Sequence, residues 1–155
     1  MARKDQPKIP RRGGVGETGL RYTRCMAAEA VPTLRVLIVD DHPSFRSALS
    51  SALSMEAGIE VAGQAGGGQE ACDEAARLRP DAIVMDLSMP DVDGIRAMRR
   101  IHETDPDVPV VILTANADAA SERHARAAGA RGFLPKGSGL RDLVGLLHEA
   151  TAGAA

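Results

Sequence analysis

From residue 34 onward, short apolar runs alternate with segments in which apolar residues recur every three or four positions. The runs are rich in Val, Ile and Leu, which is typical of strands buried on both faces of a sheet. The intervening segments have the period of amphipathic helices. Because strands that alternate with helices form parallel sheets covered on both faces, the sequence predicts a doubly wound α/β domain.

Five strands and five helices are expected in this region. The predicted strands, each a short apolar run, cover residues 34–39, 59–65, 81–86, 109–113 and 131–134. The predicted helices, each with an apolar stripe, cover residues 43–53, 69–78, 95–101, 118–128 and 140–147. Asp93 is expected to cap the third helix and Gly129 to end the fourth. These apolar runs are far shorter than the ~20 residues that a membrane span needs.

The composition argues against base-stacking surfaces and disulfide chemistry. Aromatic residues make up 2% of the sequence (Tyr22, Phe45 and Phe133), too few for a surface that stacks single-stranded bases. The two cysteines, Cys25 and Cys72, form neither a disulfide framework nor a four-ligand zinc site. Because no secretory signal is visible, the protein is expected in the cytoplasm with reduced thiols.

Residues 1–33 differ from the rest of the chain in charge. They carry seven Lys and Arg residues against three acidic ones, a net charge of +4, which leaves −6 for residues 34–155. Pro, Gly and Arg dominate without apolar periodicity, so a disordered basic extension is expected. It is suited to non-specific nucleic-acid contacts at most, and an extension without function is the preferred interpretation. Met26 is an alternative translation start, which would remove the basic segment from the native protein.

Polar residues stand where the predicted strands end. Asp40 and Asp41 follow the first strand, Asp86 ends the third, Thr114 follows the fourth and Lys136 follows the fifth. Asp and Thr are common as turn or cap residues at any single strand end. Five such residues on these strands nevertheless point to a site, because ligands of doubly wound sheets bind at the carboxyl ends of the strands.

The charges suggest the chemistry of that site. Carboxylates held close together repel one another and call for a cation. Oxygen ligands suit Mg²⁺, which also binds phosphate oxygens and leaves one carboxylate to attack phosphorus in line. Asp86, between the acidic pair and Lys136, is the best-placed nucleophile. Lys136 and the Thr114 hydroxyl would bind the transferred phosphoryl oxygens.

The residues around these positions form an ordered series of motifs. They are Leu-Arg-Val-Leu-Ile-Val-Asp-Asp-His-Pro at 34–43, Asp-Ala-Ile-Val-Met-Asp-Leu-Ser-Met-Pro at 81–90, Asp-Val-Asp-Gly at 91–94, Val-Ile-Leu-Thr-Ala at 111–115 and Ala-Gly-Ala-Arg-Gly-Phe-Leu-Pro-Lys at 128–136. The series resembles the response regulator receiver domains of two-component signalling, and its Asp-His-Pro opening is most similar to the NarL/LuxR-type branch. The resemblance implies a flavodoxin-like, CheY-like fold with strand order 2-1-3-4-5, a receiver domain over residues 34–151 and a tail over 152–155.

The resemblance also implies roles for the site residues. Asp86 is similar to the family's phosphorylated aspartate, and Asp40 and Asp41 to its Mg²⁺-binding acids, with Asp86 and the Ser88 main-chain carbonyl completing the ligands. Thr114 and Lys136 are similar to the family's switch hydroxyl and phosphate-pairing lysine.

Further positions are implied to act in switching and dephosphorylation. Ala115 adjoins the switch hydroxyl in the phosphate-binding set, and Phe133 falls where the family keeps an aromatic residue that rotates inward on activation. Ser88 and Asn116 occupy the two positions that influence self-dephosphorylation in the family. Since both are small and polar, an intermediate phosphoryl lifetime is expected.

The partners expected from the resemblance are proteins of a phosphorelay. A sensor histidine kinase or phosphotransfer protein would donate the phosphoryl group, and the chain would assist its own phosphorylation and dephosphorylation without being an enzyme for other substrates. The output protein is unknown, and a phosphorylation-dependent homodimer through residues 118–128, 131–134 and 140–147 is one expected readout. Neither specific DNA binding nor membrane binding is expected.

Several alternatives stay open. The chain ends at Ala155, where NarL-type regulators continue into a helix-turn-helix domain, so it is either a stand-alone receiver or the truncated remnant of a DNA-binding transcription regulator. A phosphorylation-independent pseudo-receiver is a third interpretation, although no acidic residue or lysine of the motif is lost. A haloacid-dehalogenase-type phosphatase is disfavoured, because Ser88 stands where such enzymes need a second aspartate.

Overall fold

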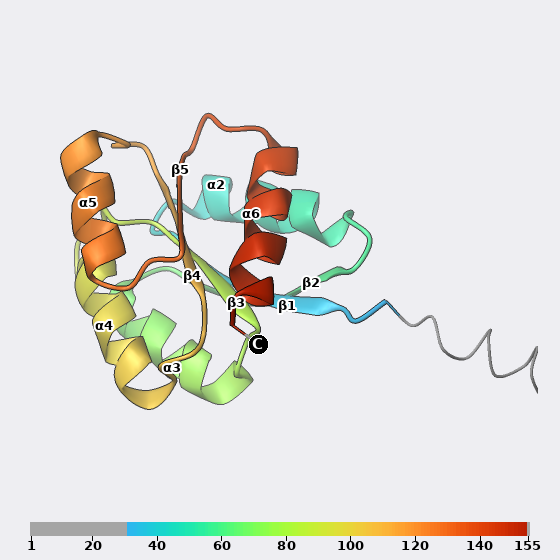
Figure 1. The fold of residues 1–155 in the computed structure, drawn as a ribbon, viewed down its shortest axis with the longest axis horizontal. Coiled ribbons are helices and arrows are strands. Elements are labelled where there is room, and N and C mark those ends of the chain that lie inside the picture. Colours follow the sequence, from blue (N-terminus) through green and yellow to red (C-terminus); the bar gives the residue numbers. More distant parts are fainter. Residues whose placement is uncertain (1–30, 155) are drawn as a thin grey trace, which may run out of the picture. The chain divides into compact units, whose positions relative to one another are not determined.

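The alternating segments of the sequence form one parallel sheet with the strand order β2-β1-β3-β4-β5 (Figure 1). This computed structural model describes residues 31–154. The strands are β1 (Leu34–Val39), β2 (Ile59–Ala65), β3 (Ala82–Met85), β4 (Val110–Thr114) and β5 (Gly132–Pro135). The helices are α2 (Pro43–Ser54), α3 (Gly68–Leu78), α4 (Gly94–Thr104), α5 (Ala119–Ala127) and α6 (Leu140–Ala152). The predicted fold class and strand order are therefore confirmed.

Helices cover both faces of the sheet, and each face has its own apolar core. Helices α3, α4 and α5 pack on one face, and α2 and α6 on the other (Figure 1). Strand β1 serves both cores, because successive side chains of a strand point to opposite faces. Leu37 and Val39 belong to the core under α3, α4 and α5, whereas Val36 and Ile38 belong to the other. This double burial explains why the strand sequence is continuously apolar.

The element boundaries shift by a few residues from those expected. The segment predicted as strand 81–86 pairs only over Ala82–Met85, although the amides of Asp81 and Asp86 still bond to carbonyls of β1. Helix α6 continues past Leu147 to Ala152, since Ala150 is buried against the sheet and extends the apolar stripe. Asp93 caps α4 as predicted.

Helix α5 (Ala119–Ala127) ends one residue earlier than the predicted 118–128, and Gly129 follows the cap residue instead of being the cap itself. The cap residue is Ala128, and Gly129 follows it with a φ of 112°, a left-handed conformation that glycine adopts without strain. The amide of Gly129 donates to the Arg126 carbonyl and that of Ala130 to the Ala125 carbonyl, at 3.1 and 2.9 Å. These two bonds form the usual closing motif of a helix and turn the chain into β5.

The reversal of strand order at β1 places the ends of β1 and β3 side by side at the carboxyl edge of the sheet. Sites in doubly wound folds form at such a reversal. No helix among the described residues is long and apolar enough to cross a membrane. The predicted basic extension and the alternative start at Met26 lie outside the described residues, apart from residues 31–33.

Candidate functional site

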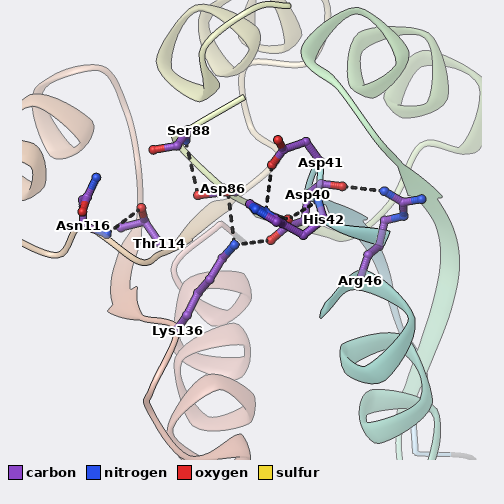
Figure 2. A network of polar contacts seen from close by, with 9 residues as sticks. All are labelled: Asp40, Asp41, His42, Arg46, Asp86, Ser88, Thr114, Asn116 and Lys136. Carbon is purple, nitrogen blue, oxygen red and sulfur yellow. Dashed lines mark hydrogen bonds and ion pairs between the residues drawn. The ribbon is translucent and has the colours of Figure 1, made fainter. Parts of the chain in front are cut away.

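The lysine after β5 joins the carboxylates that follow β1 and β3. Lys136 Nζ lies 2.7 Å from Asp40 Oδ2 and 3.2 Å from Asp86 Oδ2 (Figure 2). Both carboxylates are almost fully buried, with Asp40 2% and Asp86 3% exposed. Buried charges need partners, and here one ammonium serves two carboxylates that would otherwise repel each other. The structure thus brings together Asp40, Asp86 and Lys136 as the sequence predicted.

The position of Lys136 affects its own protonation. Burial of the ammonium by itself lowers its pKa, but hydrogen bonds and charge attraction from Asp40 and Asp86 outweigh burial and raise the pKa above its ordinary value. The Phe45 ring of α2 adds a further contact, with its centroid 4.6 Å from the ammonium. An aromatic face at this distance attracts a cation. Lys136 is therefore held as a fixed positive charge at the carboxyl edge.

Asp41 supplies a buried oxygen that lacks a hydrogen-bond donor. Among the described residues, its Oδ1 is the one buried side-chain oxygen or nitrogen without a hydrogen-bond partner. The ring Nδ1 of His42 lies 3.1 Å away without forming a hydrogen bond to it. Asp40, Asp41, His42 and Asp86 offer ligand atoms that all lie within 4.8 Å of one another.

This donor set fits a divalent cation. An unpartnered buried carboxylate oxygen is costly unless a positive charge or a donor approaches it. Carboxylate oxygens are the ligands that a hard ion such as Mg²⁺ prefers. The acidic group of Asp40, Asp41 and Asp86 therefore meets the requirements of the predicted Mg²⁺ site on its own chemistry.

The hydroxyl at the end of β4 faces its own loop. Thr114 is fully buried, and its Oγ1 accepts a hydrogen bond from the Asn116 amide at 3.3 Å (Figure 2). Ala115 and Asn116 are exposed at the start of the following loop. Figure 2 shows Thr114 and Asn116 on the opposite side of Asp86 from Asp41 and Arg46. Thr114 is thus at the edge that the sequence predicted, with its hydroxyl bonded locally and not to Asp86.

Ser88 lies in the loop after β3, and Phe133 lies in β5. The Ser88 amide donates to Asp86 Oδ1 at 3.3 Å, so the loop after β3 turns back beside the carboxylate that precedes it. Phe133 of β5 is 9% exposed and belongs to the core under α3, α4 and α5. The aromatic ring is therefore packed inside the domain in this structure.

Three residues near the site were not singled out from the sequence. The His42 amide donates to Asp40 Oδ1 at 2.8 Å, and Arg46 donates to the Asp40 main-chain carbonyl from the first turn of α2. Phe45 contacts Lys136 as described. His42 follows the acidic pair directly, so adjacency was a usable signal. For Phe45 and Arg46 the helical spacing indicated only a turn of α2, and their contacts depend on where that helix packs.

Comparison with known proteins agrees with this geometry. Residues 36–148 match the family model of the response regulator receiver domain. The chain belongs to this family. The sequence-based resemblance to response regulators is thus confirmed, and the domain is a receiver of the two-component type.

Individual relatives show how much of longer proteins the chain matches. It is 36% identical to the response regulator GacA of Pseudomonas viridiflava over 120 residues, which cover 77% of this chain and 56% of GacA. It is 47% identical over 109 residues to a protein-glutamate methylesterase/protein-glutamine glutaminase of Geobacter metallireducens, covering 68% of this chain and 31% of that protein. The chain therefore spans little more than half the length of GacA and about a third of the methylesterase.

A solved structure extends the likeness to three dimensions. A LuxR-family two-component response regulator from Aurantimonas sp. SI85-9A1 superposes with a TM-score of 0.75 at 33% identity, covering 78% of this chain and 86% of that chain. This likeness agrees with the branch that the Asp-His-Pro opening indicated.

Proposed function

We propose that this chain is a phosphoacceptor that carries a phosphoryl group on Asp86. The observation that supports this most directly is the pairing of one ammonium, that of Lys136, with the buried carboxylates of Asp40 and Asp86. A carboxylate held beside both a cation and further acids suits in-line attack on a phosphoryl group. The negative charge that develops on the phosphoryl oxygens in the transition state is stabilised by positive groups already held in place. The donor is a phosphohistidine of a sensor histidine kinase or phosphotransfer protein.

The proposed step exchanges one bond to phosphorus for another. An Asp86 carboxylate oxygen attacks phosphorus, the phosphorus–nitrogen bond of the donor breaks, and the departing imidazole takes up a proton from solvent. The product is an acyl phosphate on Asp86. Lys136, already 3.2 Å from Asp86 Oδ2, is close enough to exchange part of its carboxylate contacts for the new phosphoryl oxygens.

Asp40, Asp41 and Asp86, with the Ser88 main-chain carbonyl, are the residues proposed to hold Mg²⁺. When bound, the ion neutralises charge on the phosphoryl oxygens. The buried Asp41 Oδ1, which accepts no hydrogen bond, supports this assignment. His42 sits at the exposed rim of the same group, 3.3 Å from Asp40 Oδ1, and helps to orient that carboxylate.

The readout proposed for phosphorylation is a shift in a two-state equilibrium. Phosphorylation adds a charge of about −1.5 to −2, which attracts the Thr114 hydroxyl away from the Asn116 amide. Ala115 moves with it, and Phe133 is the aromatic residue whose packing follows. The face formed by α5, β5 and α6 is the proposed docking or dimerisation surface.

Ser88 and Asn116 are proposed to set the lifetime of the acyl phosphate. The reaction is proposed to take place in the cytoplasm.

Intact-protein mass spectrometry tests the proposal. The full chain is incubated with acetyl phosphate, with and without Mg²⁺, alongside Asp86→Asn. We expect one phosphoryl adduct that requires Mg²⁺, is absent from Asp86→Asn and disappears on standing. An adduct that persists in Asp86→Asn would place the phosphoryl group on another residue. No adduct under any condition would leave a phosphorylation-independent binding module as the better account.

A further inference from the structure

The loop between β3 and α4 is tied to the start of α3 by a side chain far away in sequence. Asp91 Oδ1 accepts a hydrogen bond from the Gly68 amide at 3.0 Å, and Asp91 Oδ2 accepts one from the Gln69 amide at 3.2 Å. The N-cap residue of α3 is Gly67, which has no side chain to offer. Asp91 therefore lies in a different loop but accepts hydrogen bonds from the first amides of α3, which an N-cap side chain normally accepts.

Two glycines at the start of α3, the N-cap Gly67 and the first helical residue Gly68, allow the loop to come this close. A Cβ atom added to Gly67 would lie 2.7 Å from Asp91 Oδ2, and one added to Gly68 would lie 2.6 Å from Val92 Cβ. Real Cβ atoms do not approach other atoms this closely, so a side chain at Gly67 would displace the Asp91 carboxylate, and one at Gly68 would push away the loop at Val92. Gly67 and Gly68 of the glycine run after β2 are thus explained by contact with the loop.

The other end of the same loop lies beside the phosphoacceptor. The Ser88 amide donates to Asp86 Oδ1 at 3.3 Å, and the Leu87 carbonyl accepts a bond from the Gly94 amide at 3.0 Å. Ser88 stands only three residues before Asp91. A loop of this length held at both ends has little freedom, so releasing Asp91 would loosen the backbone at Ser88.

The charge of Asp91 suits its position. Hydrogen bonds from the backbone amides of Gly68, Val92 and Gln69 hold the pKa of the Asp91 carboxyl below its usual range. The carboxylate is therefore ionised at neutral pH, where it also interacts favourably with the positive end of the α3 dipole. In the described part of the chain Asp91 forms no hydrogen bond with Asp86, so it acts on the site through the loop.

We propose that Asp91 is a positioning residue which, with Gly67 and Gly68, fixes the loop that holds Ser88 beside Asp86, and thereby sets the Mg²⁺ affinity and the phosphorylation rate of the site. This inference rests on the proposed function in that it assigns the acidic group to Mg²⁺ and Asp86 to the phosphoryl group. Groups that orient metal ligands without touching the metal influence affinity strongly.

A matched pair of variants separates positioning from helix stability. Asp91→Ala removes the bonds from the loop to α3. Glu70→Ala is the control, because Glu70 Oε2 accepts from the Gly66 amide at 2.7 Å and so supports the same helix start, with no hydrogen bond to the loop within residues 31–154. Gly67→Ala crowds the carboxylate out of its place with Asp91 itself intact, and Asp91→Asn keeps one acceptor. Thermal unfolding of each full-length variant establishes that it is folded.

The readouts are Mg²⁺ affinity from amide chemical-shift titration and phosphorylation rate with acetyl phosphate. We expect Asp91→Ala to bind Mg²⁺ about tenfold more weakly and to react correspondingly more slowly, with Glu70→Ala within about twofold of wild type. Gly67→Ala should resemble Asp91→Ala, and Asp91→Asn should fall between. Equal losses in Asp91→Ala and Glu70→Ala, or an unchanged Mg²⁺ affinity in Asp91→Ala, would overturn the proposal.

Hydrogen exchange distinguishes this inference from the proposed function. The amides of residues 87–89 and 91–93 should exchange faster in Asp91→Ala than in Glu70→Ala, whether or not Asp86 is phosphorylated. If wild type forms no acyl phosphate, the proposed function fails, while the exchange rates and Mg²⁺ affinities still decide the role of Asp91. Unchanged exchange in residues 87–89 and 91–93 would show that Asp91 does not fix the loop.

Discussion

The two ends of the parallel sheet use similar side chains for different purposes. At the amino end, Asp81 accepts from the Arg35 amide at 2.8 Å, and the Arg35 guanidinium donates to the Leu78 carbonyl at 2.9 Å. These bonds complete the backbone where strands and helices meet. At the carboxyl end, Asp40 and Asp86 are buried beside each other and share one ammonium.

The difference shows where this fold gives up stability for chemistry. The buried polar residues of the described chain, Asp40, Asp86 and Thr114, all lie at the carboxyl end. Like charges that are close and poorly hydrated repel strongly, because the protein interior screens them less than water does. Charges at the amino end are matched to backbone groups and stabilise the fold. A site that concentrates carboxylates is therefore expected to become more stable when one of them is removed.

The largest expected effect is the loss of the cation at the carboxyl end. Lys136→Met leaves two buried carboxylates without their ammonium, so the free energy of unfolding should fall by about 3 kcal/mol. Mg²⁺ should restore much of that loss. Urea unfolding with and without Mg²⁺ measures both effects. Arg35→Met is the matched control at the amino end. An equal loss of unfolding free energy in both variants, independent of Mg²⁺, would show that the two ends of the sheet do not differ in this respect.

Removal of a carboxylate from the site should act in the opposite direction. Asp86→Asn keeps the size of the side chain and reduces the repulsion with Asp40 and Asp41. Without Mg²⁺, its free energy of unfolding should rise by about 1.5 kcal/mol, and added Mg²⁺ should stabilise it less than wild type. Chemical unfolding at neutral pH tests the sign. A destabilised Asp86→Asn would mean that its pairing with Lys136 outweighs the repulsion.

The same kind of substitution at the amino end should only destabilise. Asp81→Ala deprives the Arg35 amide of its acceptor, which should lower the free energy of unfolding by about 1 kcal/mol. Mg²⁺ should leave this loss unchanged, because Asp81 lies at the far edge of the sheet from the acidic group. A Mg²⁺-dependent change in Asp81→Ala would show that the two ends are coupled.

The smallest effect is expected in the acid dependence of stability at Asp91. Its pKa is lower in the folded protein than its ordinary value, so the carboxylate stabilises the fold above that ordinary value. This contribution is lost as the pH falls through the lowered folded-state pKa. Wild type should therefore exceed Asp91→Asn in thermal stability at neutral pH, with the gap closing in acid. A gap that does not change with pH would rule out ionisation as its source.

Much of the fold and site could be predicted because both follow from local pattern. Apolar period distinguished strands from helices, and the parallel arrangement then placed Asp40, Asp86 and Lys136 at one edge. The exact strand ends could not be predicted, since they depend on where the neighbouring strand stops, as at Asp81. Helix α6 was underestimated because Ala150 carries too weak an apolar signal to mark a buried position.

The sequence alone thus determined the order of the elements, the family and the residues at the carboxyl edge, because periodicity and motif spacing are properties of contiguous chain. The folded arrangement was needed to show that Lys136 reaches both carboxylates, that the Thr114 hydroxyl faces Asn116, and that Asp91 caps a helix 23 residues before it in the chain. These contacts depend on side-chain rotamers and on packing between separate elements. No local pattern encodes them.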